Sequence, residues 1–204
     1  MALVSEYQGV IFDFGGVLVA HQNDADQARL AALAGISPTK FFDLYWSYRL
    51  DYDKGLVSNV EYWQTVARNG GSTLTPDTID QLTHLDNESW MQFDPSMWEW
   101  VGQLRSAGKP VAMLSNMPRD LGEALRKTDR LEQFDYVTLS YEARSAKPEP
   151  AIYEHCLAGL GTPPGKTLFL DDRMPNVEAA EKLGIRAVHF VDRDEVLAKL
   201  RGYY

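Results

Sequence analysis

The stretch Val10–Leu18, with the sequence VIFDFGGVL, places one aspartate, Asp13, at the end of an apolar strand. A buried charge is costly unless a metal ion or hydrogen bonds compensate for it, so Asp13 needs a reason to be there. Gly15 and Gly16 allow a sharp turn and let a ligand approach the backbone. Two readings are open at this point: a ligand site, or an aspartate that caps its own turn through its carboxylate.

The composition is that of a globular protein with an acidic balance. The chain has 204 residues, 45% of them hydrophobic and 24% charged, which suits one domain or a domain carrying an insertion. The formal net charge of -9 repels phosphate backbones and anionic lipid, so we expect neither nucleic acid nor a membrane as a partner.

The expected compartment is the cytoplasm. No stretch approaches ~20 continuous apolar residues, and the N-terminus lacks a basic region followed by an apolar one. The single cysteine, Cys156, cannot form an internal disulfide and fits a reducing compartment. The oligomeric state is left open between a monomer and a homodimer.

From Asp94 onward, helix and strand signals alternate. This pattern predicts a Rossmann-like α/β fold, in which a mostly parallel sheet carries helices on both faces and includes the strand at 9–14. The further predicted strands cover residues 111–114, 136–139, 167–170 and 186–190, and the predicted helices cover 94–108, 119–131, 150–159, 176–183 and a last segment to the C-terminus.

Residues 19–91 carry helical signals without an obvious strand. Ser37-Pro38 and Thr75-Pro76 have the N-cap-then-proline pattern of helix starts. The predicted helices cover 24–33, 37–50, 59–69 and 75–87. An all-helical block after the first strand predicts an inserted helical cap at 19–91, on an α/β core formed by 1–18 and 92–204.

Polar side chains follow several predicted strands at their carboxyl ends, where ligands bind in an open parallel sheet. Asp13, Asp171 and Asp172 offer the hard oxygen ligands that Mg²⁺ prefers. Ser115-Asn116 and Lys147 offer a hydroxyl, an amide and an ammonium group to anionic oxygens. A carboxylate not fully engaged by metal could attack phosphorus and form an aspartyl-phosphate.

Each of these groups, taken singly, also has a structural explanation. Ser115-Asn116 could bond to local backbone in a turn, and Lys147 could be a solvated loop lysine. Asp171-Asp172 could be an acidic helix start favoured by the helix dipole. Only their joint placement at strand ends favours a functional site.

The chain resembles the haloacid dehalogenase-like hydrolases, most of which are Mg²⁺-dependent phosphatases. The matching segments occur in the family's order and span nearly the whole core, and the helical insertion resembles the cap that some members carry after the first motif. These segments are FDFGGVL at 12–18, LSN at 114–116, AKPE at 146–149, and FLDD at 169–172 followed by NVEAA at 176–180.

For the reacting groups, the resemblance implies that Asp13 is the nucleophile that takes the phosphoryl group. It implies that Lys147 stabilises both the nucleophile and the transferring group. Ser115 matches the hydroxyl that holds a phosphoryl oxygen, with Asn116 beside it at the substrate, and the Gly15-Gly16 turn is expected to contact the phosphate as well.

For the metal, the resemblance implies Mg²⁺ bound by Asp13, by the backbone carbonyl of Gly15 and by the acidic pair. Of that pair, Asp172 is expected to be the direct ligand and Asp171 the closer support. His84, His155 and His189 are scattered along the chain and suggest no metal site.

The chain departs from the family pattern at Gly15, where family phosphatases usually carry a second aspartate as general acid and base. Its loss removes a contribution of ~10²- to 10⁴-fold in rate. The chain thereby resembles a subgroup with glycine at this point, which includes bacterial sugar-phosphate phosphatases of the α-D-glucose-1-phosphate phosphatase type. His21 is a candidate for proton transfer, with a solvated linker histidine as the favoured alternative.

The sequence thus predicts a Mg²⁺-dependent phosphatase acting on a small phosphorylated metabolite, with sugar phosphates as one class, through an aspartyl-phosphate on Asp13. The alternatives are a 2-haloacid dehalogenase, which Asp171-Asp172 argues against, and a catalytically weak binding or regulatory protein, suggested by Gly15. Arg144 and Arg173, which border the motifs, are expected to be surface groups.

Overall fold

The computed structural model of the protein describes residues 6–194 and residue 196. The predicted last helix lies mostly outside the described residues. None of the described helices is long and apolar enough to cross a membrane.

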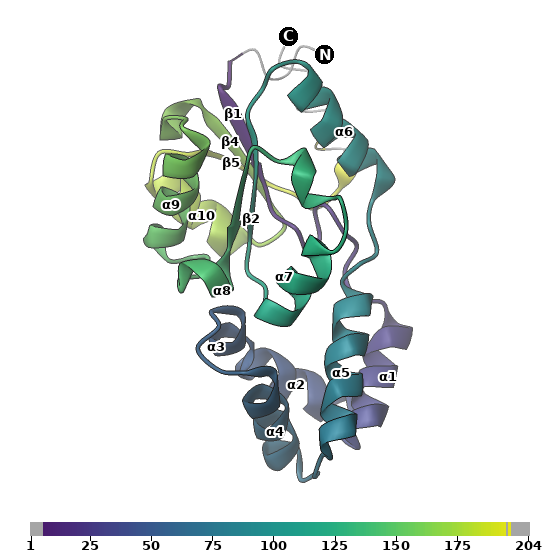
Figure 1. Ribbon diagram of the computed structural model, residues 1–204. Helices are drawn as coiled ribbons and strands as arrows, with labels where there is room; N and C mark the ends of the chain where they lie inside the picture. Colours follow the sequence, from purple (N-terminus) through teal and green to yellow (C-terminus); the bar gives the residue numbers. More distant parts are fainter. Residues whose placement is uncertain (1–5, 195, 197–204) are drawn as a thin grey trace.

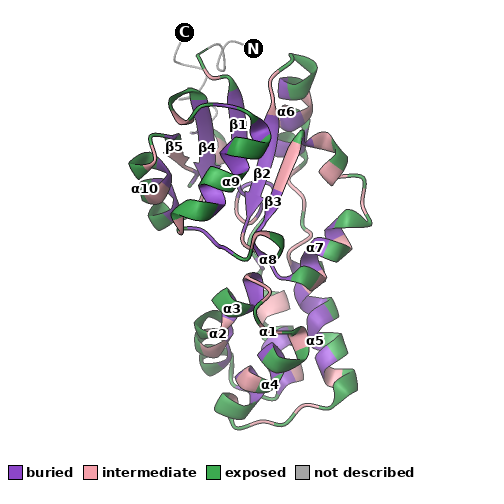
Figure 2. Ribbon diagram, turned by 60° about the vertical axis from the view of Figure 1, so that its left-hand side comes forward, coloured by how far each residue is buried: buried purple, intermediate pink, exposed green. Residues whose placement is uncertain are grey.

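The predicted parallel sheet is confirmed. Its strands are β1 (Gly9–Phe12), β2 (Val111–Ser115), β3 (Tyr136–Leu139), β4 (Thr167–Asp171) and β5 (Arg186–His189). They run in the order β3-β2-β1-β4-β5, and every neighbouring pair is parallel (Figure 1). The three central strands, β2, β1 and β4, are buried along their whole length (Figure 2), which explains why they read as continuous apolar runs.

Helices cover both faces of this sheet. On one face, α6 (Pro95–Ser106) and α7 (Arg119–Arg126) share a hydrophobic cluster with side chains of β1, β2, β3 and β4. On the other face, α9 (Pro150–Leu160) and α10 (Met174–Lys182) form a second cluster with β1, β2 and β4. The carboxyl ends of the parallel strands therefore point to a single edge of this three-layer core.

Five helices lie between β1 and α6 in the chain: α1 (Asp24–Ala34), α2 (Pro38–Ser47), α3 (Arg49–Asp53), α4 (Asn59–Gly70) and α5 (Pro76–Ser89). They have a hydrophobic cluster of their own, whose buried members all fall between Leu30 and Leu85. At the boundary, Val19, Trp90 and Met91 pack against the cluster of the sheet instead. On the basis of the separate cluster, we propose that residues 19–91 form the cap and that 1–18 and 92–204 form the core, with the end residues of the cap lying against that core.

The helix boundaries differ from the prediction in three places. The helix predicted at 37–50 is interrupted at Tyr48, so that α3 begins as a separate helix at Arg49. The helix predicted at 119–131 already ends at Arg126, because the Thr128 hydroxyl donates to Leu125 O and accepts from Arg130 N in place of helical bonds. A short helix, α8 (Ser140–Ala143), was not predicted.

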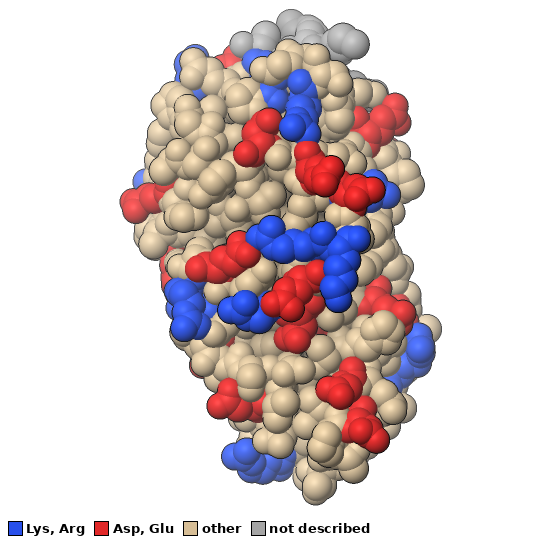
Figure 3. All heavy atoms as spheres, in the orientation of Figure 1, with Lys and Arg blue, Asp and Glu red and all other residues tan. Residues whose placement is uncertain are grey.

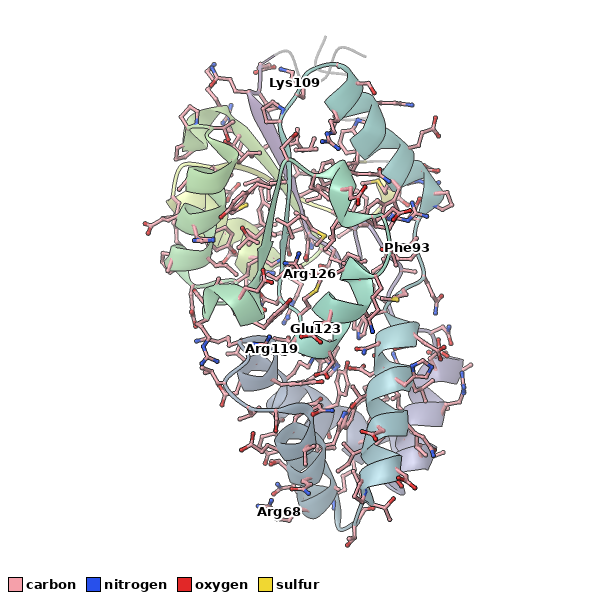
Figure 4. The ribbon with its side chains drawn as sticks, in the orientation of Figure 1. Arg68, Phe93, Lys109, Arg119, Glu123 and Arg126 are labelled. Atoms are coloured by element: carbon pink, nitrogen blue, oxygen red, sulfur yellow. The ribbon has the colours of Figure 1, made fainter. Side chains whose placement is uncertain are left out.

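The cap contacts the core around α3. Tyr52 Oη donates to Asp120 Oδ2 on α7 at 2.9 Å, and Lys54 Nζ lies 2.7 Å from Glu149 Oε1. Ser140 Oγ on α8 donates to the Asp53 carbonyl at 2.5 Å. Figure 4 places Arg119 and Glu123 at the end of α7 that faces the cap. Around this junction, basic and acidic side chains lie next to one another in Figure 3.

We expect Leu82→Ala to lower the free energy of unfolding by about 2–5 kcal/mol, because this fully buried leucine of α5 leaves a cavity in the cap cluster. Urea unfolding followed by tryptophan fluorescence measures the change. The control is Leu56→Ala, at a site that is 52% exposed, with an expected effect within about 0.5 kcal/mol. Equal effects of the two substitutions would contradict a packed cap.

Candidate active site

Asp13 lies directly after β1, in the first turn beyond the sheet. Its backbone N–H still donates to Leu170 O at 2.9 Å, so the residue continues the pairing of β1 with β4. Its carboxylate accepts from Phe14 N at 2.6 Å through Oδ1, and the residue is only 6% exposed. The carboxylate is therefore held at the carboxyl edge of the sheet, as the sequence predicts.

The turn after Asp13 requires glycine at position 16. Gly16 has a φ of 72°, in the left-handed region that favours glycine, and its N–H donates to Val19 O at 2.9 Å. A Cβ atom there would lie 2.7 Å from His21 Nε2 and 2.9 Å from Asp172 Cγ. Gly16 thus lets the acidic pair approach the backbone next to Asp13.

Lys147 lies between two carboxylates. Its Nζ is 2.7 Å from Asp13 Oδ1 and 2.7 Å from Asp171 Oδ2, and its side chain is 1% exposed. Burial lowers the pKa of a lysine, but here the two carboxylates outweigh that effect and the pKa of Lys147 is raised. Lys147 is therefore held as a buried cation beside Asp13 and is not the solvated lysine of the alternative reading.

Asp171 has several hydrogen-bond donors around its carboxylate. Besides Lys147, Arg173 N donates to Oδ1 at 2.8 Å, and Asn176 Nδ2 lies 3.0 and 3.1 Å from the two oxygens. Burial alone raises the pKa of Asp171, but the ammonium group and these donors outweigh it and the pKa is lowered. Asp171 is thus an ionised carboxylate that orients Lys147.

Asp172 is more open than its neighbour. Its side chain is 16% exposed and faces the cavity described below, and its Oδ2 lies 3.3 Å from His21 Nε2. This hydrogen bond raises the pKa of His21. His21 is exposed in the linker to the cap, as the favoured alternative predicted. It is not merely solvated, however, because it also contacts Asp172 of the acidic pair.

Ser115 ends β2, and Asn116 follows it, on the other side of Asp13. Ser115 is 3% exposed and lines the cavity, and its hydroxyl has no hydrogen-bond partner among the described residues. Asn116 uses its amide differently: Nδ2 donates to Lys147 O at 2.8 Å, and Oδ1 accepts from Lys147 N at 2.8 Å. The Asn116 side chain thus positions the backbone of Lys147, and the residue also lines the cavity, so that its place at the substrate stays a prediction.

The acidic residues fit a divalent cation. Asp13, Asp171 and Asp172 each offer a carboxylate oxygen, and these oxygens all lie within 4.8 Å of one another. With Lys147 as the cation among them, the group of four has a surplus of negative charge, and burial raises the pKa of Asp13 well above its usual value. A hard dication at this place would balance the surplus and favour the ionised Asp13. The residues that could hold it are Asp13, Asp172 and the Gly15 carbonyl.

The indole of Trp90, at the end of the cap, occupies the space next to Gly15, where family phosphatases usually carry the second aspartate. A Cβ atom at position 15 would lie 3.2 Å from Cζ3 of Trp90, so a longer side chain there requires the indole to move. The indole is held by a hydrogen bond from its Nε1 to Tyr45 Oη at 3.2 Å. The glycine at 15 and the tryptophan at 90 are therefore sterically linked.

A cavity of about 450 Å³ lies between the core and the cap, which is within the usual range of ligand sites. Core side chains form one wall, with Asp13, Ser115, Lys147 and Asp172 among them. Cap side chains form the opposite wall. These are Trp46, Arg49, Leu50 and Asp53, with Trp90 beside them at the end of the cap.

Most of the predicted site residues come together around this cavity, while two further groups were missed. Asn176 lies in a quoted motif, but no role was predicted for it, and no site role was predicted for Trp46, Leu50 or Trp90. Only the match of the motif at 176–180 could have pointed to Asn176. Arg173 is exposed as expected, yet it lines the cavity. Arg144 is also exposed, and it donates to Gly55 O across the junction with the cap.

Comparison with known proteins supports the reading of the motifs. The family model of the haloacid dehalogenase-like hydrolases matches residues 7–184, and thus all of the segments above. A HAD family enzyme of Bacteroides thetaiotaomicron, crystallised with magnesium, superposes with a TM-score of 0.78 at 22% identity, over 96% of this chain and 100% of that chain. At that identity, the likeness shows the fold.

Two curated relatives cover nearly the whole chain. The mouse protein called acyl-CoA dehydrogenase family member 10 is 37% identical over 95% of this chain, which spans 18% of that protein's length. A sesquiterpene phosphatase of Aspergillus oryzae is 24% identical, over 98% of this chain and 97% of its own length. The fold, the order of the motifs and the family match agree, and the chain belongs to the haloacid dehalogenase-like hydrolase family.

Proposed function

We propose that the protein is a Mg²⁺-dependent phosphatase that hydrolyses the phosphate monoester of a small metabolite. This proposal rests on the group of Asp13, Lys147 and the acidic pair at the core wall of the cavity. The phosphatase named among the relatives supports the same reading. The enzyme of Bacteroides thetaiotaomicron crystallised with magnesium supports the choice of metal.

In this proposal, a carboxylate oxygen of Asp13 attacks phosphorus, the bond from phosphorus to the ester oxygen breaks, and the ester oxygen leaves as an alcohol after taking a proton from water. Water then attacks the aspartyl-phosphate, which releases inorganic phosphate and restores Asp13. Lys147 neutralises charge on both Asp13 and the transferring phosphoryl group, and the Ser115 hydroxyl donates to a phosphoryl oxygen. Bound Mg²⁺ would supply a further positive charge next to the phosphoryl oxygens.

The acidic pair weighs against a 2-haloacid dehalogenase. That reaction needs no metal and has a carboxylate substrate, to which Asp171 and Asp172 would add repulsion. The surplus of negative charge in the site instead fits the binding of a dication together with a phosphate ester.

We expect Asp13→Asn to lower phosphate release from p-nitrophenyl phosphate by at least about 10³-fold, because an amide cannot act as the nucleophile. The assay is run with and without Mg²⁺, and with halide release from 2-chloropropionate in parallel. Asp51→Asn, at an exposed position outside the cavity, is the matched control and should keep full activity. Turnover that survives removal of both Asp13 and Mg²⁺ would contradict the proposal.

The two members of the acidic pair should respond differently to substitution. We expect Asp172→Asn to raise the Mg²⁺ concentration for half-maximal activity by more than about tenfold, because it weakens a direct ligand. Asp171→Asn should lower the free energy of unfolding by more than about 1 kcal/mol, because Lys147 loses a buried partner. Metal titrations of activity and urea unfolding of both variants separate the two roles, and identical behaviour would argue against them.

Restoring an acid at position 15 should require room for it. We expect Gly15→Asp alone to bring no gain in kcat, because already the Cβ atom of the new side chain would crowd the Trp90 indole. In the double variant with Gly15→Asp and Trp90→Ala, the change in kcat should exceed the product of the changes in the two single variants by about tenfold or more. This is within the usual range of general acid catalysis. The kcat values of the four proteins in this cycle measure the interaction, and independent effects would refute the steric link.

A further inference from the structure

The cap presents an apolar wall to the cavity. Trp46 at the end of α2 and Leu50 in α3 are one helical turn apart, and both line the cavity. Trp46 is 49% exposed and Leu50 is 50% exposed. Large apolar side chains that are open to solvent on the wall of a cavity favour an apolar ligand that covers them.

Trp90 extends this wall to the reacting groups. Its ring lies edge-to-face against Trp46, with 6.3 Å between the ring centroids, and its Cζ3 reaches Gly15, two residues after Asp13. The hydrogen bond to Tyr45 fixes the indole in this place. The apolar surface is therefore continuous from the neighbourhood of the nucleophile to Leu50.

The polar side chains of the same cap wall are already engaged. Arg49 Nε lies 2.8 Å from Asp53 Oδ1, and Arg49 Nη1 lies 2.8 Å from Asp86 Oδ2. The arginine is 5% exposed and Asp86 is 1% exposed. Drawing Arg49 toward a ligand would leave buried carboxylates without their partner, which is strongly unfavourable. Arg49 is thus held by the carboxylates of the cap rather than turned toward a ligand.

On the core wall, the polar groups around Asp13 belong to the phosphate end of the cavity, and the exposed Arg173 is a further polar side chain of that wall. The amides of Asn116 and Asn176 are bonded to Lys147 and Asp171, and Ser115 and Asp172 lie around Asp13. Hydroxyl groups of a sugar that pack on the ring faces of the indoles and on Leu50 would lose water there without gaining a hydrogen bond, and a polar group buried in that way carries a penalty.

We propose that the cavity takes phosphate monoesters whose alcohol is hydrocarbon-like, with Trp46, Leu50 and Trp90 as the residues that determine this specificity. This inference rests on the proposed phosphatase function and names the substrate class of the same site. It differs from the sugar phosphates suggested by the resemblance of the first motif, and the experiments below distinguish the two substrate classes.

The experiment uses esters with one type of leaving oxygen, because Gly15 supplies no acid and the rate will depend on the leaving group. Phenyl, 4-ethylphenyl and 4-butylphenyl phosphate keep the phenol nearly constant while the apolar part grows. We expect kcat/KM to rise about fourfold for each added methylene that is buried, until the cavity is filled. A flat or falling series would overturn the inference.

An isosteric pair tests the polarity directly. 4-Propylphenyl phosphate and 4-(2-hydroxyethyl)phenyl phosphate differ by a methyl group against a hydroxyl group. We expect the hydroxyl compound to have a kcat/KM at least about tenfold lower, because its hydroxyl finds no partner on the cap wall. Equal values, or glucose 6-phosphate above 4-butylphenyl phosphate, would also overturn the inference.

Two variants assign the effect to the cap wall. Leu50→Gln and Trp46→Gln should each reduce the ratio of kcat/KM between 4-butylphenyl and phenyl phosphate by threefold or more. Leu56→Gln is the matched control, because Leu56 is equally exposed but does not line the cavity, and it should leave this ratio unchanged. The ratio is insensitive to a partly unfolded preparation, and an equal loss in all three variants would refute the assignment.

The two proposals fail in different ways. If no ester releases phosphate in an Mg²⁺- and Asp13-dependent manner, then the proposed phosphatase function is wrong, and with it this inference. If phenyl phosphate is hydrolysed in that manner but the apolar series is flat, the phosphatase function stands and only the hydrocarbon-like substrate is refuted.

Discussion

The ammonium group of Lys147 lies between the carboxylates of Asp13 and Asp171, 2.7 Å from an oxygen of each and almost without exposure to solvent. Two buried carboxylates at the ends of neighbouring strands would repel one another. The shared ammonium group offsets this repulsion and allows an aspartate at the end of both β1 and β4. Asn116 then matters because it holds the backbone of Lys147 through both atoms of its amide. The geometry of the site thus depends on one ion-pair triad that connects β1, β2, β4 and the loop before α9.

The cap contributes the other constraint. Its cluster of aromatic side chains is organised around Arg49, which is paired with Asp53 and Asp86 and lies over the ring of Tyr45. This network places the Tyr45 hydroxyl where it accepts a hydrogen bond from Trp90, and Trp90 in turn lies against Gly15. The absent acid and the apolar wall are consequently connected. Because position 15 has no side chain, the Trp90 indole can lie near the nucleophile, where it extends the apolar wall that continues to Leu50.

Much of this could be read from the sequence, for identifiable reasons. The strands are buried on both faces, so their apolar runs were easy to find, and parallel strands bring their following residues to one edge. Helix ends were less predictable, since Thr128 ends α7 through side-chain bonds that compete with the backbone. The orientation of the Asn116 side chain depends on its hydrogen bond to Lys147, 31 positions away, and no local sequence pattern encodes such a contact. The stretch around Trp46 has the spacing of packing residues, and Phe41 and Tyr45 do pack, while Trp46 lies open in the cavity.

The sequence by itself determined the α/β core, the helical insertion, the family motifs and the residue types of the reacting groups, because these depend on local composition and on order along the chain. The resemblance predicted different roles for Asp171 and Asp172, but only the tertiary structure showed that donors enclose Asp171 while Asp172 faces the cavity, since the two are neighbours with the same chemistry. The tertiary structure also decided that Trp90 covers Gly15 and that Arg49 is turned into the cap. Those outcomes depend on how the cap packs on the core, and packing between distant segments follows from shape and from the pairing of buried charges, which a linear pattern does not specify.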